Sequence, residues 1–143
     1  MGTKQGGTIR AWSRTLTLLG GMLFLSATAG CSAGEAMETD MITDTDWHLS
    51  SQRSAYFRIE GEELTGSDSC NRLMGRVKLY DASPSTIDFG AGPASTRMAC
   101  PDTQKTEEAM REALHGTRAA SQTDESTLVL RDEQTGREWT FVQ

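Results

Sequence analysis

The fold class is decided first by the stretch Tyr56-Phe57-Arg58-Ile59-Glu60, which Gly61 ends. Successive side chains of a β-strand point to opposite faces of the sheet. Phe57 and Ile59 therefore point one way, while Arg58 and Glu60 point the other. This alternation predicts a strand with one buried face and one solvated face.

Further stretches repeat this alternation. Arg76-Val77-Lys78-Leu79-Tyr80 does so with Val77 and Leu79 inward, and Thr86-Ile87-Asp88-Phe89 follows before Gly90 and Gly92-Pro93. Near the C-terminus, Leu128-Val129-Leu130 and Trp139-Thr140-Phe141-Val142 flank the turn residues Asp132-Glu133-Gln134-Thr135-Gly136. This last arrangement is typical of a β-hairpin.

One stretch has the period of a helix. Residues 106–114 place Ala109, Met110, Ala113 and Leu114 on one stripe, after the start signal Pro101-Asp102-Thr103 and before the stop signal Gly116. We therefore expect an α+β domain. It is an antiparallel, mostly β meander of about six to eight short strands with one helix packed on it.

The N-terminal residues 1–30 have the order of an export signal. Lys4, Arg10 and Arg14 come with no acid, and an apolar run from 16 to 25 follows, shorter than the ~20 residues that a membrane-spanning helix needs. The small pair Ala29-Gly30 before Cys31 resembles the bacterial lipobox, whose cysteine is acylated and becomes the new N-terminus. Thr28 stands where the lipobox prefers Leu, and a soluble secreted protein is the alternative.

We therefore expect a protein anchored in the cell membrane by a lipid on Cys31 and facing the extracytoplasmic side. Stable anchoring follows when two or more acyl chains enter the bilayer. Removal of residues 1–30 moves the formal charge from −6 to −9. A nucleic-acid partner needs a basic face, so this charge argues against one.

The segment 31–46 has few apolar residues and many acids. It contains Glu35, Glu38, Asp40, Asp44 and Asp46 and no base. Such a composition predicts an acidic flexible tether, although its carboxylates could also bind calcium. Residues 47–143 remain and suffice for one small domain.

The chain has three cysteines, an odd number for an exported protein. Lipidation of Cys31 leaves Cys70 and Cys100 as a pair in a compartment where disulfides persist. A redox-active or metal-binding pair is the competing interpretation, but the spacing is not CxxC and neither cysteine has a nearby histidine.

Two segments carry a family resemblance. Gly66-Ser67-Asp68-Ser69-Cys70-Asn71, followed by Thr96-Arg97-Met98-Ala99-Cys100, resembles the META domain family, whose bacterial members include a heat-shock protein. Trp47-His48-Leu49 stands where that family opens with a Trp-x-Leu strand, and the resemblance extends over 45–142. Ser69 departs from the family, which usually has Gly before Cys-Asn.

The resemblance implies an antiparallel, mostly β domain with one helix on secreted or lipid-anchored bacterial proteins. It connects the family in places with stress tolerance, drug resistance and virulence, and it implies no known reaction. Its motif residues in this chain are Asn71, Thr96, Arg97 and Met98 beside the two cysteines.

An enzyme would use one of the two histidines with a nearby serine or carboxylate. His48, beside Trp47, is better explained as a half-exposed strand residue, and His115 lies in the last expected helical turn, where a cation interacts well with the helix dipole. Neither belongs to a motif such as GxSxG or HExxH. The sequence therefore indicates no catalytic residue and no cofactor.

A metal site with sulfur ligands is the other possible functional site. Met74 and Met98 lie four and two residues from Cys70 and Cys100, and thioethers with thiolates suit Cu(I). The alternative is that both methionines are core side chains packed against the disulfide. We expect the latter and no metal site.

Arg97 can be a surface residue, a contact for a partner, or one half of a structural ion pair with a carboxylate such as Asp68. Anchor, tether and stable domain together predict a non-enzymatic envelope protein that presents a sheet face or loop to another envelope component. The alternative is a carrier of a small hydrophobic ligand or lipid. An enclosed apolar cavity would favour the carrier, and a filled core with an exposed patch would favour the interaction module.

Overall fold

The computed structural model describes residues 39–143. The signal peptide expected over 1–30 and the lipidated Cys31 lie outside these residues. No helix of the described part is long and apolar enough to cross a membrane.

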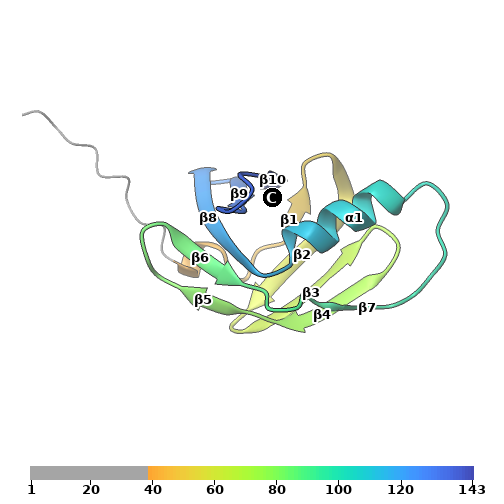
Figure 1. Cartoon of the computed structure of the whole chain (residues 1–143), viewed down its shortest axis with the longest axis horizontal. Coiled ribbons are helices and arrows are strands. Elements are labelled where there is room, and N and C mark those ends of the chain that lie inside the picture. Colours follow the sequence, from red (N-terminus) through yellow and green to blue (C-terminus); the bar gives the residue numbers. More distant parts are fainter. Residues whose placement is uncertain (1–38) are drawn as a thin grey trace, which may run out of the picture. The chain divides into compact units, whose positions relative to one another are not determined.

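Ten strands form one antiparallel sheet that curves around a helix (Figure 1). The sheet order is β5-β6-β8-β9-β10-β1-β2-β3-β4-β7, and the chain is thus α+β and mostly β, as expected. The strands are β1 (Trp47–Leu49), β2 (Gln52–Glu60), β3 (Glu63–Asp68), β4 (Arg72–Arg76), β5 (Lys78–Tyr80), β6 (Ser85–Asp88), β7 (Ala94–Ser95), β8 (Thr117–Asp124), β9 (Thr127–Arg131) and β10 (Glu138–Val142).

The described strands number ten rather than the six to eight expected from the sequence. The missed strands have few apolar residues. β8 buries only Arg118 and Ala120, and β3 buries only Leu64 and Asp68. Period-two patterns of large apolar side chains cannot reveal strands of this kind, because their backbone pairing rather than their side chains places them in the sheet.

The stretch 76–80 was expected to be one strand, but the structure divides it. β4 ends at Arg76 and β5 begins at Lys78, with the buried Val77 between them. The Val77 N–H donates to the carbonyl of Glu62 at 2.9 Å. The chain leaves β3 at this point and pairs with β6 at the other end of the sheet order.

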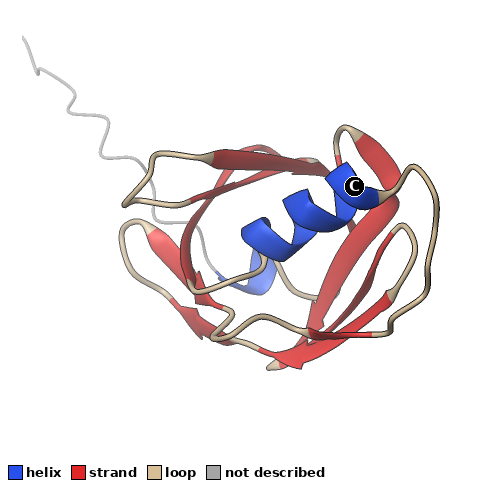
Figure 2. Cartoon of the chain, turned by 45° about the vertical axis from the view of Figure 1, so that its right-hand side comes forward, coloured by secondary structure: helices blue, strands red, loops and turns tan. Residues whose placement is uncertain are grey.

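The helix α1 (Gln104–Ala113) lies inside the curve of the sheet (Figure 2). Met110, Ala113 and Leu114 are buried and Ala109 is partly buried, which confirms the expected stripe. Thr103 precedes the first helical residue, and Gly116 turns the chain out of the helix with a φ of +65°, which glycine adopts without strain.

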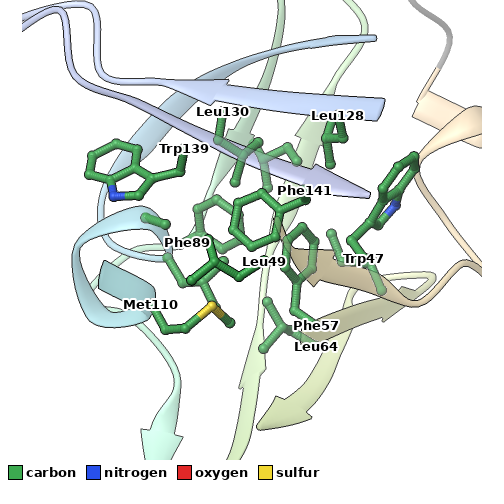
Figure 3. Packing of buried hydrophobic residues seen from close by; sticks show 14 of the residues in the cluster. Trp47, Leu49, Phe57, Leu64, Phe89, Met110, Leu128, Leu130, Trp139 and Phe141 are labelled. Carbon is green, nitrogen blue, oxygen red and sulfur yellow. The ribbon is translucent and has the colours of Figure 1, made fainter. Parts of the chain in front are cut away.

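The core fills the space between sheet and helix (Figure 3). Phe57 packs edge-on against Phe141, with ring centroids 4.9 Å apart, and against Phe89 at 6.3 Å. Trp47 and Ile59, like these rings, are buried. Phe57 and Ile59 thus face inward as their alternation predicts.

The described end of the segment expected to be a flexible tether packs onto the domain. A 3₁₀ turn (Thr39–Met41) leads to Ile42, which is fully buried, and the indole N–H of Trp47 donates to the Ile42 carbonyl at 2.9 Å. The Asp44 N–H donates to the carbonyl of Ile59 at 2.8 Å. A single isoleucine thus brings residues 39–46 into the fold, because burying it removes a large apolar side chain from water.

Ala33–Gln143 forms one compact unit, and every buried residue of the core lies within it. The hydrophobic core of residues 39–143 therefore lies within a single unit.

Candidate functional site

The turn between β3 and β4 is organised by the buried carboxylate of Asp68. Its Oδ1 accepts from the N–H of Cys70 at 3.0 Å and from that of Asn71 at 2.6 Å. Its Oδ2 accepts from the side-chain amide of Asn71 at 3.3 Å. A carboxylate that receives three hydrogen bonds tolerates burial and fixes the turn.

Ser69 occupies the strained position of this turn. Its φ is +84°, a region that L-residues with a Cβ rarely adopt. The preference of related sequences for Gly here therefore has a backbone cause. The Ser69 hydroxyl also pairs with that of Ser54 at 2.8 Å.

Asn71 connects the turn to a loop that is distant in sequence. Its side-chain Oδ1 accepts from the N–H of Met98 at 2.7 Å and from the hydroxyl of Thr96 at 3.3 Å. The Thr96 hydroxyl in turn accepts from the N–H of Arg72 at 3.0 Å. The loop 96–98 has no regular secondary structure, yet these hydrogen bonds fix its backbone.

A disulfide joins the same two regions. Cys70 and Cys100 are bonded, with Cα atoms 6.0 Å apart and a sequence separation of 30. Beyond Cys100, the Thr103 hydroxyl donates to the Cys100 carbonyl at 3.2 Å and hydrogen-bonds to the carboxylate of Glu107 in α1. The loop is therefore held at one end by β4 and at the other by the start of the helix.

Two open grooves flank this loop. The inner groove, of about 690 Å³, lies between the loop and α1, with the buried Leu73 and Met110 among its apolar residues and the exposed Arg97, Glu108 and Arg111 among its charged ones. The groove is open to solvent and combines apolar with charged side chains.

The outer groove, of about 610 Å³, lies on the other side of the loop. It is lined by residues from β2, β3 and β4, among them Tyr56, Thr65, Arg72 and Met74. Met98 contributes to both grooves. The loop is thus a wall between two concave surfaces.

Arg97 does not form the ion pair with Asp68 that was one expectation. Its side chain is exposed and has no hydrogen bond or ion pair with any residue in the described part of the chain. Asp68 is instead satisfied by donors of its own turn. The N–H groups of the turn donate to the carboxylate, so the long side chain of Arg97 does not have to lose conformational entropy for this purpose.

Met74 and Met98 are not core side chains, which corrects another expectation. They are 59% and 63% exposed. In β4 the neighbouring Leu73 points inward, so Met74 must point outward. Within residues 39–143 no group of three or more His, Cys, Asp and Glu could hold a metal ion.

The two histidines lie on different elements. His48 is half-buried in β1, where its Nδ1 lies 2.7 Å from the carbonyl of Arg53 and its ring contacts Tyr56. His115 is exposed and follows the end of α1 rather than lying in its last turn. The hydrogen bond of His48 is one that a strand residue makes for structural reasons.

A second polar cluster, which was not predicted from the sequence, surrounds Trp139. The guanidinium carbons of Arg118 and Arg137 lie 5.2 and 5.5 Å from the centroid of its ring. Arg118 is buried, pairs with Asp132 at 3.5 Å and donates to the Glu112 carbonyl at 2.8 Å. This cluster fastens the C-terminal hairpin to the end of α1.

The chain as a whole also resembles known proteins. The META domain family model matches residues 33–143. The chain is similar in fold to a solved protein from Burkholderia xenovorans, an NMR structure, with 21% identity, 73% of this chain and 84% of that chain covered, and a TM-score of 0.50. No curated protein matches the chain. The match over residues 33–143, most of the chain, shows that it belongs to the META domain family.

Proposed function

We propose that this chain is a lipid-anchored protein of the bacterial envelope and that its META domain is a non-enzymatic interaction module. The module presents the loop 96–98 and the inner groove to another envelope component. Family membership supports an envelope role. The stress and drug tolerance seen in the family would then depend on what the loop binds.

The observation that carries the proposal is the contrast within the loop itself. The backbone at Met98 is fixed by Asn71 and the loop is closed by the disulfide. The Arg97 side chain is exposed and without a partner among the described residues. A loop held in one conformation loses little entropy on binding, and arginine is common at the energetic centre of protein interfaces.

The alternative of a carrier for a hydrophobic ligand has less support. The side chains of sheet and helix fill the interior of the described domain, with Phe57, Phe89 and Phe141 packed against one another. The grooves of the described part are open to solvent. A carrier of a lipid needs an interior space of the ligand's size.

The absence of a reaction is also part of the proposal. His48 is engaged with the Arg53 carbonyl, and His115 is exposed at a position where it needs no partner. A catalytic group changes the rate about a hundredfold or more when it is removed. In a host whose stress or drug tolerance needs this protein, we therefore expect His48→Ala and His115→Ala to leave that tolerance nearly intact.

Site-specific photo-crosslinking in cells tests the binding surface. A photoreactive residue at position 97 should give a discrete adduct, while the same residue at position 133, in the exposed turn of the C-terminal hairpin, should give none. Equal adducts from both positions, or none from position 97, would contradict the proposal.

The anchor is tested separately. The chain with Cys31→Ala should move from the membrane fraction to the soluble fraction and should not incorporate labelled palmitate. Its adduct at position 97 should weaken, because the tether concentrates the domain at its site of action. Retention of the mature-sized variant in the membrane fraction would show that Cys31 is not the anchor.

A further inference from the structure

The outer groove differs in charge from the rest of this acidic protein. The chain has a formal charge of −6, yet no Asp or Glu lines this groove. Residues 70–74, which supply one wall, contain Arg72 and no acid. The acidic residues of the described part of the chain thus lie outside the outer groove.

Arg72 is the free cation of the groove. Its side chain is exposed and makes no hydrogen bond or ion pair within residues 39–143. Arg76, four residues on, is paired with Glu62 at 2.9 Å and lies opposite Glu63 in β3. Among the residues that line the groove, Arg72, next to the loop, is therefore the one that carries a charge.

Apolar side chains accompany this charge. Met74 and Met98 line the groove and are more than half exposed. They are two of the four large hydrophobic residues that the described domain leaves exposed. The hydroxyl-bearing residues Ser54, Thr65 and Ser67 also line the groove and can donate hydrogen bonds to phosphate oxygens.

We infer that the outer groove docks onto the anionic phospholipid surface of the membrane. Arg72 and the hydroxyl groups contact phosphate groups, and Met74 and Met98 enter the boundary between headgroups and acyl chains. A basic side chain near an anionic membrane surface contributes about 1 kcal/mol to binding, and apolar side chains buried at the interface add to it. The inner groove then remains turned toward a protein partner on the other side of the loop.

The inference rests on the proposed function in one respect, the lipid anchor that would keep the domain near the membrane. If the lipid is on Cys31, the eight peptide units up to Thr39 span at most about 28 Å, so the domain stays close to the lipid surface. A weak contact of the groove is then made at a high effective concentration. The contact itself does not need the anchor and can be measured without it.

The test uses the unacylated unit Ala33–Gln143 with vesicles. It should sediment with vesicles of phosphatidylglycerol and phosphatidylcholine, less so as salt increases, and not with vesicles of phosphatidylcholine alone. Arg72→Gln should lower the partition coefficient about fivefold. Met74→Ser with Met98→Ser should lower it as well.

Lys105→Gln is the matched control. Lys105 is also exposed, has no partner among the described residues and lies outside both grooves. Its removal should leave the partition coefficient within about twofold, since charge alone should not decide the binding.

No binding to anionic vesicles, equal binding to neutral ones, or an equal loss with Lys105→Gln would overturn the inference. Backbone amide NMR shifts on vesicle or short-chain lipid addition should change around Tyr56, Arg72 and Met98; changes elsewhere alone would also overturn it. Because this unit carries no lipid anchor and no protein partner, failure here leaves the crosslink at position 97 and the fractionation of Cys31→Ala as independent tests of the proposed function.

Discussion

The turns at Asp68 and Asp132 have the same local hydrogen bonds but differ in what they hold in place. Asp68 accepts the N–H groups two and three residues ahead of it, those of Cys70 and Asn71. Asp132 does the same with Gln134 and Thr135, at 2.9 and 3.1 Å. Both turns close a local hairpin, but the first also holds a loop some 25 residues away.

The difference lies in the residue that ends each turn. Asn71 is buried and extends its side chain to Thr96 and Met98. Thr135 is exposed, and its hydroxyl contacts groups of its own turn, the carboxylate of Asp132 and the N–H of Arg137 at 3.4 Å. The Asp132 turn is tied to the body through its own carboxylate and Arg118. The side chain of Asn71 thus extends the first turn to a loop that is distant in sequence, which the second turn does not do.

Of the changes considered for the two turns, removal of the disulfide should lower the free energy of unfolding the most. Cys100→Ser should lower the free energy of unfolding by about 3 to 4 kcal/mol, because the bridge closes a loop of 30 residues in the unfolded chain. Urea unfolding measures the loss. Reduced wild type should show a similar loss, and a variant as stable as the oxidised wild type would refute this account of the loop.

Asn71→Ala should have the next largest effect. It leaves the Met98 N–H and one oxygen of Asp68 without their partner, and unmet buried polar groups cost about 2 kcal/mol. Thr135→Ala, at the matching position of the other turn, should cost about 0.5 kcal/mol or less. Equal losses in urea unfolding would mean that the two turns do not differ.

Ser69→Gly should stabilise the domain by about 1 kcal/mol, because glycine adopts the φ of +84° without strain. Glu133 holds the same position in the Asp132 turn and is not in the left-handed region. Glu133→Gly should therefore give no gain. The melting temperatures of both variants decide the matter, and a loss of stability in Ser69→Gly would show that the hydroxyl contact with Ser54 outweighs the strain.

The smallest effect concerns pH. The N–H of Thr135, then that of Gln134 and the charge of Arg118, lower the pKa of Asp132 below its usual value. A lowered pKa means that the carboxylate stabilises the fold above about pH 4 and that this stabilisation is lost as the pH falls through the lower folded value. Asp132→Asn should thus lose less stability than wild type between pH 7 and about pH 3. An identical acid dependence of the urea midpoints would contradict this.

Much of the fold follows from the pattern of apolar residues. The alternation at Phe57 and Ile59, the stripe through Met110, and the hairpin of β9 and β10 are all confirmed, since each side chain is buried where its period places it. The strand β8 could not be foreseen in this way. Its sequence is polar, and it joins the sheet through backbone hydrogen bonds with β6 and β9.

The sequence was enough to name residues of the candidate site, but not to predict which of them contact one another. The family resemblance identified Asn71, Arg97, Met98 and the cysteines, but it could not show that Asn71 binds Met98 or that Arg97 is free. The contacts of Asn71 with Thr96 and Met98 depend on the approach of segments far apart in sequence. For Met74, the neighbouring inward Leu73 was a usable signal, because adjacent strand residues face opposite sides.

Hydrogen exchange at the amide of Met98 tests most directly whether Asn71 holds the loop in place. In wild type this N–H should be protected like the neighbouring strand amides, although it lies on an exposed loop. Asn71→Ala should bring its exchange close to that of an unstructured peptide and leave the amide of Thr135 unchanged. Thr135→Ala should leave the amide of Met98 protected. Rapid exchange of Met98 in the wild type would contradict the account of a fixed loop.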